Sequence, residues 1–436
     1  MSLPELIEIV PLKEAFRAEI TVPGSKSITN RALVLAALAE GATTLKGALW
    51  SEDTQVMVAC LQKLGFTAEV KPDSGEFCNR HITVQGIGGK IPKAGTADAP
   101  LELFVGNAGT AARFLSALVC LGRGVYRLHG VPRMHERPQA ALFKALRELG
   151  YQVDAAGDRL PAVIHGAGPK VGKCRVSIEE SSQFASALML CAKRGGWAVE
   201  VTGENAEESP YVVMTAKLIE AFPTSGGEFQ IEPDASSGSY FWSAGALLSW
   251  NSFKPDGIKV LNWPESGWQV DSKFRDYSLN KITAKETGIS REGDLGDSIM
   301  TAIVMAPLDP RNRPGPKHFT DLGRLRMQEC ERVEALRTEL TRCGAKVVET
   351  DDTLEVFPSS LHGAEIETYN DHRMAMCFAI LGLKVPGIKI KNPACVKKTF
   401  PNFFQKLAAA PPHGLGAAIL DGRTGPALSG EDLFAD

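Results

Sequence analysis

The sequence predicts an α/β protein that contains more than one domain. Its 436 residues are enough for two or three domain cores. Short β-rich runs alternate with amphipathic helical segments along the chain. A unit in which a helix ends, a glycine follows and a strand begins recurs at 61–70, 146–153 and 341–348. This recurrence indicates internal duplication, but dinucleotide-binding folds alternate similarly, so the pattern alone fixes only the α/β class.

The first expected elements lie near the N-terminus. Residues 18–22 read as a strand that Pro23-Gly24 stops, and Ser27 is the expected N-cap of a helix that Gly41 ends. Further strands are expected at 43–46, 81–84, 124–129, 174–178 and 198–202. Further helices are expected to start near Thr54, Thr110, Pro138, Ser182, Tyr211, Ser237, Ser298, Glu331, Arg373 and Asn402.

A domain crossing is expected about halfway along the chain. Residues 228–232 read as a strand that ends in the Pro233-Asp234 turn, and we place the crossing there. The proline-rich segment 309–317 predicts an irregular loop. After about Ala408 the chain is rich in Pro, Gly and Ala, which predicts an extended or poorly ordered tail.

Composition and charge exclude several classes of protein. The net charge is −3, so no global basic field is available for nucleic acid or a membrane surface. The N-terminal sequence MSLPELIEIVPLKEAF resembles no signal or transit peptide, and no apolar run is long enough to span a bilayer. The nine cysteines and eight histidines show no metal-ligand spacing. We therefore expect reduced thiols, a cytoplasmic protein and no metal.

Lys26, Ser27 and Arg31 cluster at the start of the first expected helix. Ser27 and Arg31 are four residues apart and so face the same way. Free backbone N–H groups, the positive end of the helix dipole and two cations together suit an anion. A capped helix with two solvated cations is an equally good interpretation of this stretch alone. The glycine spacing excludes a Walker A loop.

Three further polar segments precede helices in the first half of the chain, and each has a structural alternative. The glycine-rich turn 106–113 suits close approach of an anion or tight helix–sheet packing. The arginines in 132–138 suit carboxylate or phosphate, although an exposed Arg–Glu pair is commoner. Residues 180–184 suit a phosphate or sugar hydroxyl, and simple N-capping explains them equally well.

Four more such segments lie in the second half. Asp297 opens a helix as a cap or a general base, and capping is the commoner role. Segment 324–332 is typical of a solvated, salt-bridged face, residues 368–376 begin with an Asn-Asp cap, and lysine pairs such as Lys397-Lys398 are usually exposed. Together the segments place many cations at helix starts, and in α/β sheets such loops gather at one edge. A cationic cleft between two domains would suit ligands with several negative charges.

Seven motifs occur in order from about residue 20 to 405: VPGSKSITNRALVLAALAEG, GNAGTAARFL, GVPRMHERP, SSQFASALML, PDASSGSYF, TYNDHRMAM and KKTFPNFF. As a set they resemble the 5-enolpyruvylshikimate-3-phosphate synthase (3-phosphoshikimate 1-carboxyvinyltransferase) family. The resemblance implies a two-domain enolpyruvyl transferase fold, each domain built of repeated βαβαββ units, with the ligand cleft between them. It assigns 22–232 to the N-terminal, acceptor-binding domain, 1–21 with 233–410 to the C-terminal domain, and 411–436 to the tail.

The implied reaction moves the enolpyruvyl group of phosphoenolpyruvate onto the 5-hydroxyl of shikimate 3-phosphate and releases phosphate, in the shikimate pathway. The two phosphorylated carboxylates repel one another, so a cationic cleft that closes and excludes water is required. The resemblance implies no cofactor. We expect a monomer whose partners are these two small molecules, with no nucleic acid and no membrane.

The resemblance also implies a role for individual residues. The expected phosphoenolpyruvate-binding residues are Lys26, Gly109, Arg133, Gln183, Arg332, Arg373 and Lys398. The expected shikimate 3-phosphate-binding residues are Ser27, Arg31, Ser181, Ser182, Gln183, Tyr211, Asp297 and Gln328. Asp297 resembles the carboxylate that takes the hydroxyl proton, Glu329 resembles the acid that acts at carbon 3 of phosphoenolpyruvate, and Lys26 is grouped with them as catalytic.

Four positions depart from the family pattern. Gln328 stands where the family usually has a Lys that contacts the reacting hydroxyl, and Gln brings no charge. Arg324 stands where Asn is common, and Glu208 replaces a Ser that contacts the phosphate. Glu208 would repel a phosphate unless it turns away or pairs, for example with Arg324. Phe114 stands where many members have Pro, which bears on sensitivity to glyphosate.

Two other functions stay open from the sequence. A sibling enolpyruvyl transferase would use another acceptor, but the branch that uses UDP-N-acetylglucosamine typically carries a Cys in the loop matching 132–138, and this chain has none there. A non-catalytic anion-binding protein is the other alternative, and the presence of both Asp297 and Glu329 argues against it. A dehydrogenase is disfavoured because no GxGxxG follows a strand.

Overall fold

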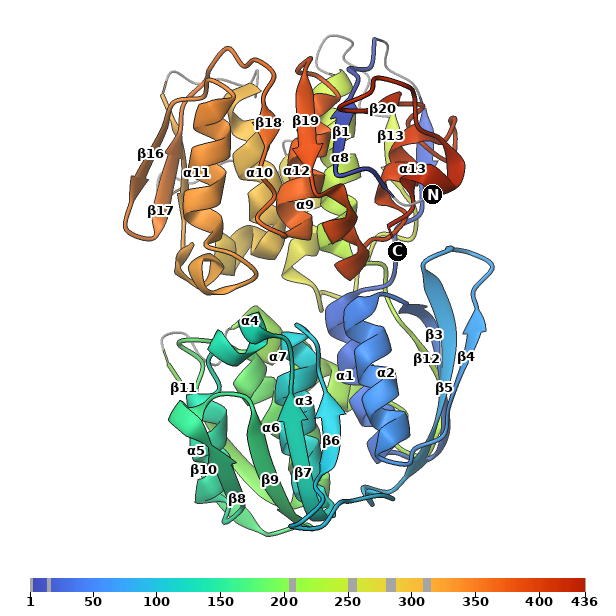
Figure 1. Cartoon of the computed structure of the whole chain (residues 1–436), viewed down its shortest axis with the longest axis vertical. Helices are drawn as coiled ribbons and strands as arrows, with labels where there is room; N and C mark the ends of the chain where they lie inside the picture. Colours follow the sequence, from blue (N-terminus) through green and yellow to red (C-terminus); the bar gives the residue numbers. More distant parts are fainter. Residues whose placement is uncertain are drawn as a thin grey trace. The chain divides into compact units, whose positions relative to one another are not determined.

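The computed structural model describes residues 3–13, 17–203, 209–249, 257–279, 288–308 and 315–435. The chain divides into two compact units. Unit 1 comprises Met1–Pro23 and Pro233–Asp436, and unit 2 comprises Gly24–Glu232 (Figure 1). The chain therefore passes from one unit to the other twice, after Pro23 and after Glu232.

Within its described residues, unit 2 contains two four-stranded sheets and one parallel strand pair. The first sheet has the order β12-β3-β5-β4, formed by Gly227–Gln230, Glu40–Leu49, Asn79–Ile87 and Ala68–Pro72. The second has the order β6-β7-β9-β8, formed by Leu101–Phe104, Arg123–His129, Ala162–Ala167 and Gln152–Ala155. The pair is β10 (Gly172–Ser177) with β11 (Trp197–Thr202). The helices are α1 (Lys26–Leu38), α2 (Glu52–Lys63), α3 (Gly109–Leu118), α4 (Pro132–Glu136), α5 (Ala140–Glu148), α6 (Gln183–Gly195) and α7 (Pro210–Ala221).

The described part of unit 1 has the same composition of sheets. One sheet has the order β14-β15-β17-β16, formed by Ile289–Ser290, Lys317–Thr320, Thr353–Val356 and Val347–Thr350. The other has the order β18-β19-β1-β20, formed by Glu365–Ile366, Ile388–Lys391, Leu6–Ile9 and Ile419–Asp421. The parallel pair is β13 (Ile258–Val260) with β2 (Ala18–Ile20). The helices are α8 (Ala235–Ser249), α9 (Phe274–Ser278), α10 (Ile299–Met305), α11 (Arg332–Arg342), α12 (His372–Gly382) and α13 (Phe403–Ala408).

The repeated unit expected from the sequence is confirmed. The order β6-α3-β7-α5-β8-β9 in unit 2 recurs as β14-α10-β15-α11-β16-β17 in unit 1, and both are βαβαββ. In all four four-stranded sheets the first two strands are parallel and the other pairs are antiparallel. Gly65, Gly150 and Gly344 follow α2, α5 and α11 with φ of +93°, +82° and +91°, a backbone conformation that favours glycine.

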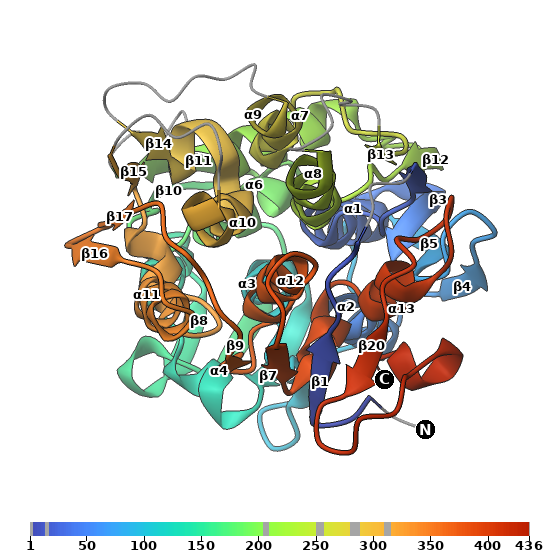
Figure 2. The ribbon, with the colours of Figure 1, turned by 90° about the horizontal axis from the view of Figure 1, so that it is seen from above.

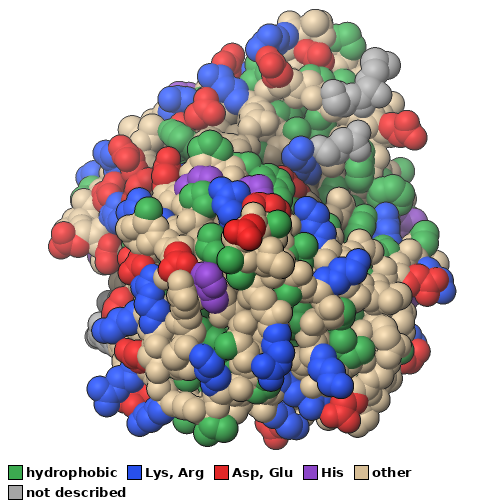
Figure 3. Space-filling model, turned by 60° about the horizontal axis from the view of Figure 1, so that its bottom comes forward, with side chains coloured by type: hydrophobic (Ala, Val, Ile, Leu, Met, Phe, Trp, Pro, Cys, Tyr) green, Lys and Arg blue, Asp and Glu red, His purple; other side chains and the backbone are tan. Residues whose placement is uncertain are grey.

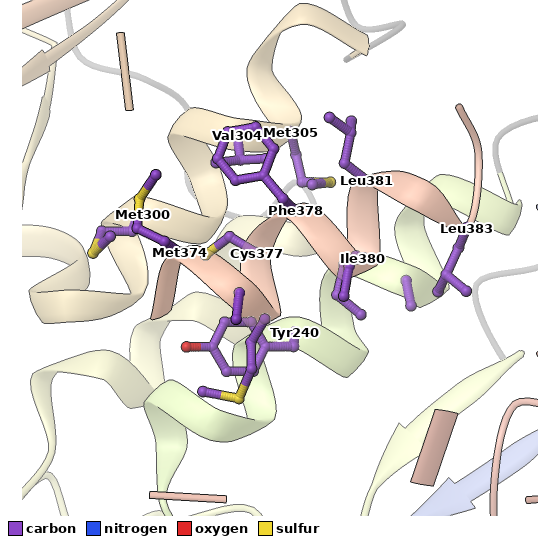
Figure 4. Close-up of a cluster of buried hydrophobic side chains, with 14 of the residues drawn as sticks. Tyr240, Met300, Val304, Met305, Met374, Cys377, Phe378, Ile380, Leu381 and Leu383 are labelled. Carbon is purple, nitrogen blue, oxygen red and sulfur yellow. The ribbon is translucent and has the colours of Figure 1, made fainter. Parts of the chain in front are cut away.

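Three helices pack together in unit 1 and fix where its polar loops begin. Figure 2 shows α8, α10 and α12 side by side, nearly end-on. Tyr240 from α8, Met300 from α10 and Phe378 from α12 are buried in their shared core (Figure 4). Because these apolar faces interlock, the N-termini of α10 and α12 are held in fixed positions, and the expected site residues Asp297 and Arg373 lie at those termini.

The ends of the first helix differ from the prediction. α1 begins at Lys26 with Ser25 as its N-cap residue, so Ser27 lies inside the first turn. The reason is that the Ser25 carbonyl already accepts the first helical hydrogen bond, from Thr29 N–H at 2.8 Å. Gly41 does not end the helix: Ala39 turns extended, and Gly41 lies in β3 with φ of +109°.

Two polar segments form ordered elements. Residues 132–136 form the short helix α4. The C-terminal segment is not a poorly ordered tail, because β20 pairs antiparallel with β1 and Leu415, Ile419 and Leu433 are fully buried. Composition suggested disorder, but these few apolar side chains are spaced so that each reaches the core of unit 1. Most of the expected loop at 309–317 lies outside the described residues.

Three further observations concern the helices, the surface charge and the cysteines. None of the helices in the described part of the chain combines the length and apolar character needed to cross a bilayer. On the face shown in Figure 3, Lys and Arg side chains are interspersed with Asp and Glu side chains. All nine cysteines are free thiols, and eight of them are buried.

Candidate active site

Lys26 stands at the start of α1, where the polypeptide turns sharply. The Cβ of any other residue at Gly24 would lie 2.0 Å from the carbonyl oxygen of Gly47, so glycine lets α1 start against β3. Lys26 Nζ lies 3.1 Å from Oδ2 of the buried Asp53, which belongs to α2. Lys26 is therefore a positioned, partly exposed cation beside free helix N–H groups, as an anion site requires.

Arg31 is almost completely buried and is bound by neutral groups. Its Nε donates to Thr215 Oγ1 at 2.8 Å, Nη1 to the Ser27 carbonyl at 2.9 Å, and Nη2 to Ser186 Oγ at 3.0 Å. Burial lowers the pKa of Arg31 to about 10. Within the described residues no carboxylate pairs with Arg31. A buried cation without a counter-charge favours an anionic ligand, so the solvated-cation alternative does not apply here.

Two arginines converge on Gly109 at the start of α3. A Cβ at Gly109 would lie 2.3 Å from Nη1 of Arg113 and 2.7 Å from Nη2 of Arg137, so a side chain would displace them. Arg113 Nη2 donates to the Pro138 carbonyl at 2.9 Å, and Arg137 Nη1 donates to the Asn107 carbonyl at 3.1 Å. Both side chains are buried. The glycine-rich turn therefore serves to bring two guanidinium groups over one helix start.

Arg133, which motif matching assigned to phosphoenolpyruvate, does not join this group. It lies on α4 with a side chain that is 44% exposed, and its Nη1 lies 2.6 Å from Oε2 of Glu136. Residues three apart on a helix share a face, which directs Arg133 outward. The backbone becomes extended at Arg137, with φ of −73° and ψ of 142°, and that turn carries Arg137 inward. In the structure, Arg137 and not Arg133 therefore lies over Gly109.

The starts of α6 and α7 carry the expected hydroxyl and amide groups. Ser182 is the N-cap residue of α6, but its side chain makes no capping hydrogen bond, contrary to the simple N-capping interpretation. Ser181 Oγ accepts from the Gln183 N–H at 3.3 Å, and Gln183 Oε1 accepts from Arg113 Nη1 at 3.4 Å. Tyr211 lies in the first turn of α7. Gln183 therefore joins the arginine pair to the serine turn.

Arg332 is the centre of the polar cluster in unit 1. It is 1% exposed at the start of α11, and its Nε donates to Asp371 Oδ2 at 2.7 Å while Nη2 donates to Glu329 Oε2 at 2.8 Å. Gln328 Oε1 also accepts from its Nη1. Burial alone would lower the pKa of Arg332, but the charges of Asp371, Glu329 and Asp297 raise it above its usual value. Segment 324–332 is therefore not a solvated face at its C-terminal end.

Glu329 is held between two cations. Its Oε1 lies 3.0 Å from Lys398 Nζ, and its Oε2 receives the hydrogen bond from Arg332. Lys398 is buried, contrary to the exposure that is usual for a lysine pair. Asp371 caps α12 by accepting from the Arg373 N–H at 2.8 Å, as expected, and it also binds Arg332. These contacts bring Gln328, Glu329, Arg332, Arg373 and Lys398 into one cluster.

Asp297 joins this cluster through Oδ2 and binds a further arginine through Oδ1. Oδ1 accepts from Arg291 Nη2 at 2.7 Å, and Oδ2 lies 3.2 Å from Arg373 Nη2 and 4.0 Å from Arg332 Nη1. Burial would raise the pKa of Asp297, but the charges of Arg373, Arg291 and Arg332 outweigh burial and hold it well below its usual range. Asp297 is therefore ionised at neutral pH.

A second buried carboxyl group lies beside Asp297. Asp271 Oδ1 accepts from the Ser298 N–H at 2.8 Å, and a Cβ at Gly296 would lie 2.6 Å from Asp271 Oδ2. Burial, reinforced by the negative charge of Asp297, raises the pKa of Asp271 to about 7. The pKa values of the two neighbouring carboxyl groups are thus displaced in opposite directions. Among the described residues, no group of His, Cys, Asp and Glu side chains is arranged to hold a metal ion.

The positions that depart from the family pattern have definite partners where they are described. Arg324 Nη1 lies 3.2 Å from Glu292 Oε1, which neutralises it within unit 1. Glu208, for which pairing with Arg324 was considered, lies outside the described residues. The ring of Phe114 is buried 5.3 Å from the guanidinium carbon of Arg31, a cation–π contact.

Sequence reasoning missed Arg137, Asp53 and Arg291. Arg137 had a local signal, because the residue before a proline favours extended backbone and so leaves the preceding helical face. Asp53 looked like one of the acidic residues common in a first helical turn. No sequence pattern indicated Arg291. It reaches Asp297 only because the turn between them folds the chain back, and no local pattern predicted the shape of that turn.

Comparison with known proteins identifies relatives over nearly the whole chain. The family model described as EPSP synthase (3-phosphoshikimate 1-carboxyvinyltransferase) matches residues 12–407. A protein of Opitutus terrae named 3-phosphoshikimate 1-carboxyvinyltransferase is 38% identical over 440 residues, covering 94% of this chain and 98% of its own.

Two solved structures share the fold at lower identity. EPSP synthase from Acinetobacter baumannii superimposes with a TM-score of 0.69 at 22% identity, covering 92% of this chain and 96% of its own. The enolpyruvyl transferase NikO from Streptomyces tendae gives a TM-score of 0.66 at 17% identity, covering 96% and 99%. These similarities confirm the fold class expected from the sequence.

Proposed function

The chain belongs to the EPSP synthase family, and on that premise we propose that it transfers the enolpyruvyl group of phosphoenolpyruvate to the 5-hydroxyl of shikimate 3-phosphate, releasing phosphate. The observation that carries the proposal is the cluster of unit 1. There Asp297 lies against Arg291 and Arg373, while Glu329 lies between Arg332 and Lys398. A reaction with one proton acceptor and one proton donor among anionic ligands needs such a set.

Phosphoenolpyruvate carries a phosphate and a carboxylate, and both suit guanidinium groups. In unit 1 the proposal assigns Arg332, Arg373 and Lys398 to this ligand. In unit 2 it assigns Lys26, Arg137, Gln183 and the backbone at Gly109. Arg137 takes the role first matched to Arg133, because Arg137 is buried over Gly109 and Arg133 is exposed and paired with Glu136.

Shikimate 3-phosphate is assigned to hydroxyl and cationic groups of unit 2. Ser27 and Arg31 suit its carboxylate, since Arg31 is a buried cation with only neutral partners among the described residues. Ser181 and Ser182 suit its phosphate, because the Ser182 hydroxyl is not used for capping. Tyr211 is assigned to its ring, and Asp297 and Gln328 of unit 1 to its reacting hydroxyl.

The chemistry follows from these assignments. The 5-hydroxyl oxygen bonds to carbon 2 of phosphoenolpyruvate, its proton passes to Asp297, and carbon 3 gains a proton from Glu329. The tetrahedral intermediate then returns a proton from carbon 3 to the Glu329 carboxylate as the bond between carbon 2 and the phosphate oxygen breaks, which restores the double bond and releases phosphate. Asp297 starts ionised because its arginine partners hold it so.

A different acceptor is the second candidate, and Gln328 is the observation that favours it. Its amide is neutral and already binds Arg332, so it offers the acceptor no positive charge. Phosphate release should therefore be measured with phosphoenolpyruvate and shikimate 3-phosphate, shikimate or UDP-N-acetylglucosamine in turn. The proposal expects release with shikimate 3-phosphate only. Release only with another acceptor would establish a sibling transferase, and binding without any release would establish a non-catalytic protein.

We further propose that the protein acts as a cytoplasmic monomer without nucleic-acid or membrane partners. Support comes from the free, mostly buried cysteines, which suit a reducing compartment. One chain also supplies every residue assigned above, so a second copy is not needed. Light scattering after size-exclusion chromatography should give the mass of one chain, and a mass of two chains would refute the monomer.

A further inference from the structure

Among the described residues, Arg291 is the cation that lies closest to Asp297, and it has no role in the assignments above. Its Nη2 donates to Asp297 Oδ1 at 2.7 Å, compared with 3.2 Å from Arg373 Nη2 and 4.0 Å from Arg332 Nη1 to Oδ2. Arg291 is only 5% exposed. It is therefore directed at the carboxylate rather than at solvent, and it approaches the oxygen that Arg373 leaves unbound.

The turn between Arg291 and Asp297 fixes the two side chains relative to each other. Residues Arg291–Leu295 form one π-helical turn, and the Gly296 N–H bonds back to the Arg291 carbonyl. Ser290 closes the turn: its N–H donates to Asp294 Oδ2 at 2.9 Å, and its Oγ accepts from the Gly293 N–H at 2.9 Å. The pair is therefore set by the protein's own hydrogen bonds and does not wait for a ligand.

Binding of phosphoenolpyruvate creates an electrostatic problem at Asp297. The ligand's negative charges neutralise Arg332 and Arg373 and add like charge close to a buried carboxylate. Like charge favours the protonated form of a carboxyl group, and a protonated Asp297 accepts no proton from the acceptor hydroxyl. A cation that the ligand does not use is needed on the opposite oxygen, and Arg291 occupies that place.

We infer that Arg291 is a positioning residue that keeps Asp297 ionised, with Oδ2 presented to the acceptor hydroxyl, while phosphoenolpyruvate occupies the other arginines. The inference rests on the proposed function. It also explains how the reaction can proceed with the neutral Gln328 in place of the usual Lys. The positive charge near the reacting hydroxyl is then supplied by Arg291, which binds the other oxygen of Asp297.

Other charged groups lie near Asp297, and their effects on its protonation must be distinguished from the effect of Arg291. Asp271 faces it from the segment before α9, with a pKa raised to about 7 by burial and by Asp297. Burial alone would lower the pKa of Arg373, but the charges of Asp297, Tyr240, Asp234 and Asp271 raise it well above its usual value. A substitution at Arg291 leaves these side chains in place, so a change that is seen in that variant but absent from a distant control follows from the loss of the Arg291 charge.

The test compares Arg291→Gln and Arg291→Lys with wild type and with Arg275→Gln, which removes an exposed ion pair to Glu265. Phosphate release is measured against pH, and thermal unfolding is measured alongside. In Arg291→Gln the acid limb of the kcat profile should move up by about 1–3 pH units, and the limb of kcat/KM should move less. Lysine should restore most of the profile, and Arg275→Gln should leave it unchanged.

An acid limb in Arg291→Gln that matches wild type would overturn the inference. If that variant does not fold, carboxyl ¹³C NMR of the wild type with phosphoenolpyruvate bound decides. The signal that is missing in Asp297→Asn should stay ionised in mildly acidic buffer, and a protonated signal would overturn the inference. A wild type that releases no phosphate with the substrate pair is a separate result, because it refutes the proposed function itself.

Discussion

Arg133 and Arg137 lie four residues apart, yet their environments are opposite. Arg133 is half exposed and bound to Glu136, while Arg137 is buried over Gly109. An exposed ion pair contributes little to the free energy of folding. A buried guanidinium group, in contrast, destabilises the folded protein unless it pairs with an anion. We therefore expect burial, and not residue type, to decide which of the two arginines binds a ligand.

This contrast predicts opposite results for two otherwise identical substitutions. Arg137→Gln should raise KM for phosphoenolpyruvate by about 10- to 100-fold, the loss expected for a charge-assisted hydrogen bond. Arg133→Gln is the matched control and should leave KM nearly unchanged. Steady-state phosphate release at varied phosphoenolpyruvate checks both. A large effect of Arg133→Gln together with a small effect of Arg137→Gln would restore the original motif match.

Asp271 gives a pH dependence of stability that can be measured. Its pKa in the folded protein is about 7, above the ordinary value of 3.8, so the folded state binds the proton more tightly than the unfolded chain does. The stabilisation is complete below the ordinary pKa and is lost as the pH rises toward 7, with a slope on the order of 1 kcal/mol per pH unit.

Asp271→Asn removes this proton and its pH dependence. The free energy of unfolding of the variant, relative to wild type, should therefore be higher at about pH 8 than at about pH 5. Chemical denaturation at both pH values measures it. Asp276→Asn, a substitution of a more exposed carboxylate, serves as the control and should show no such difference. Equal differences at the two pH values for Asp271→Asn would mean that Asp271 is ionised in the folded protein.

At the level of secondary structure, the turn before α10 requires glycine at position 296. Gly296 has φ of +57° and ψ of −138°, and a Cβ there would meet Asp271 Oδ2 and Val270 Cγ1, both at 2.6 Å. Both the backbone and the available space therefore require glycine. The position of Asp297, the next residue, depends on this turn.

We expect Gly296→Ala to lower the free energy of unfolding by about 1–3 kcal/mol, since it forces a strained backbone, and to lower kcat as Asp297 shifts. Gly157→Ala is the control, because Gly157 has φ of +60° with nothing within 4 Å of its Cβ position. It should cost less stability and leave kcat unchanged. Denaturation and phosphate release measure the two effects, and unaltered kcat in Gly296→Ala would contradict the role of the turn.

The strand β20 predicts that the C-terminal segment stabilises unit 1. Ile419 is fully buried where β20 pairs with β1, so Ile419→Ala should cost about 2–5 kcal/mol in the free energy of unfolding. Val171→Ala removes a side chain that is 97% exposed and should change it by about 0.5 kcal/mol or less. Urea denaturation compares the two, and equal small effects would show that the tail is dispensable for stability.

For the whole molecule, regular elements and repeats could be predicted because their signals are local. The glycines at 65, 150 and 344 end helices and start strands, and that pattern alone indicated the duplicated units. Helix starts near Ser182, Glu331 and Arg373 were found within a few residues from capping residues and apolar periodicity. The quoted motifs then supplied most of the candidate site.

What could not be predicted depends on contacts between distant segments. The inward turn of Arg137 depends on α4, which is too short to give a periodic signal. The reach of Arg291 to Asp297 depends on a π-helical turn, for which the sequence has no simple pattern. The order of the C-terminal segment depends on an exposed strand edge supplied by β1, at the other end of the chain.

The central claim is that the chain is an enolpyruvyl transferase in which the buried Asp297 accepts the proton of the acceptor hydroxyl. The most direct test measures phosphate release by wild type and Asp297→Asn, with binding of shikimate 3-phosphate measured by calorimetry. We predict release by wild type only when phosphoenolpyruvate and shikimate 3-phosphate are both present, and a loss of about 10²–10⁴-fold in kcat for Asp297→Asn with little change in acceptor binding. No release by folded wild type, or equal losses of turnover and acceptor binding in the variant, would contradict it.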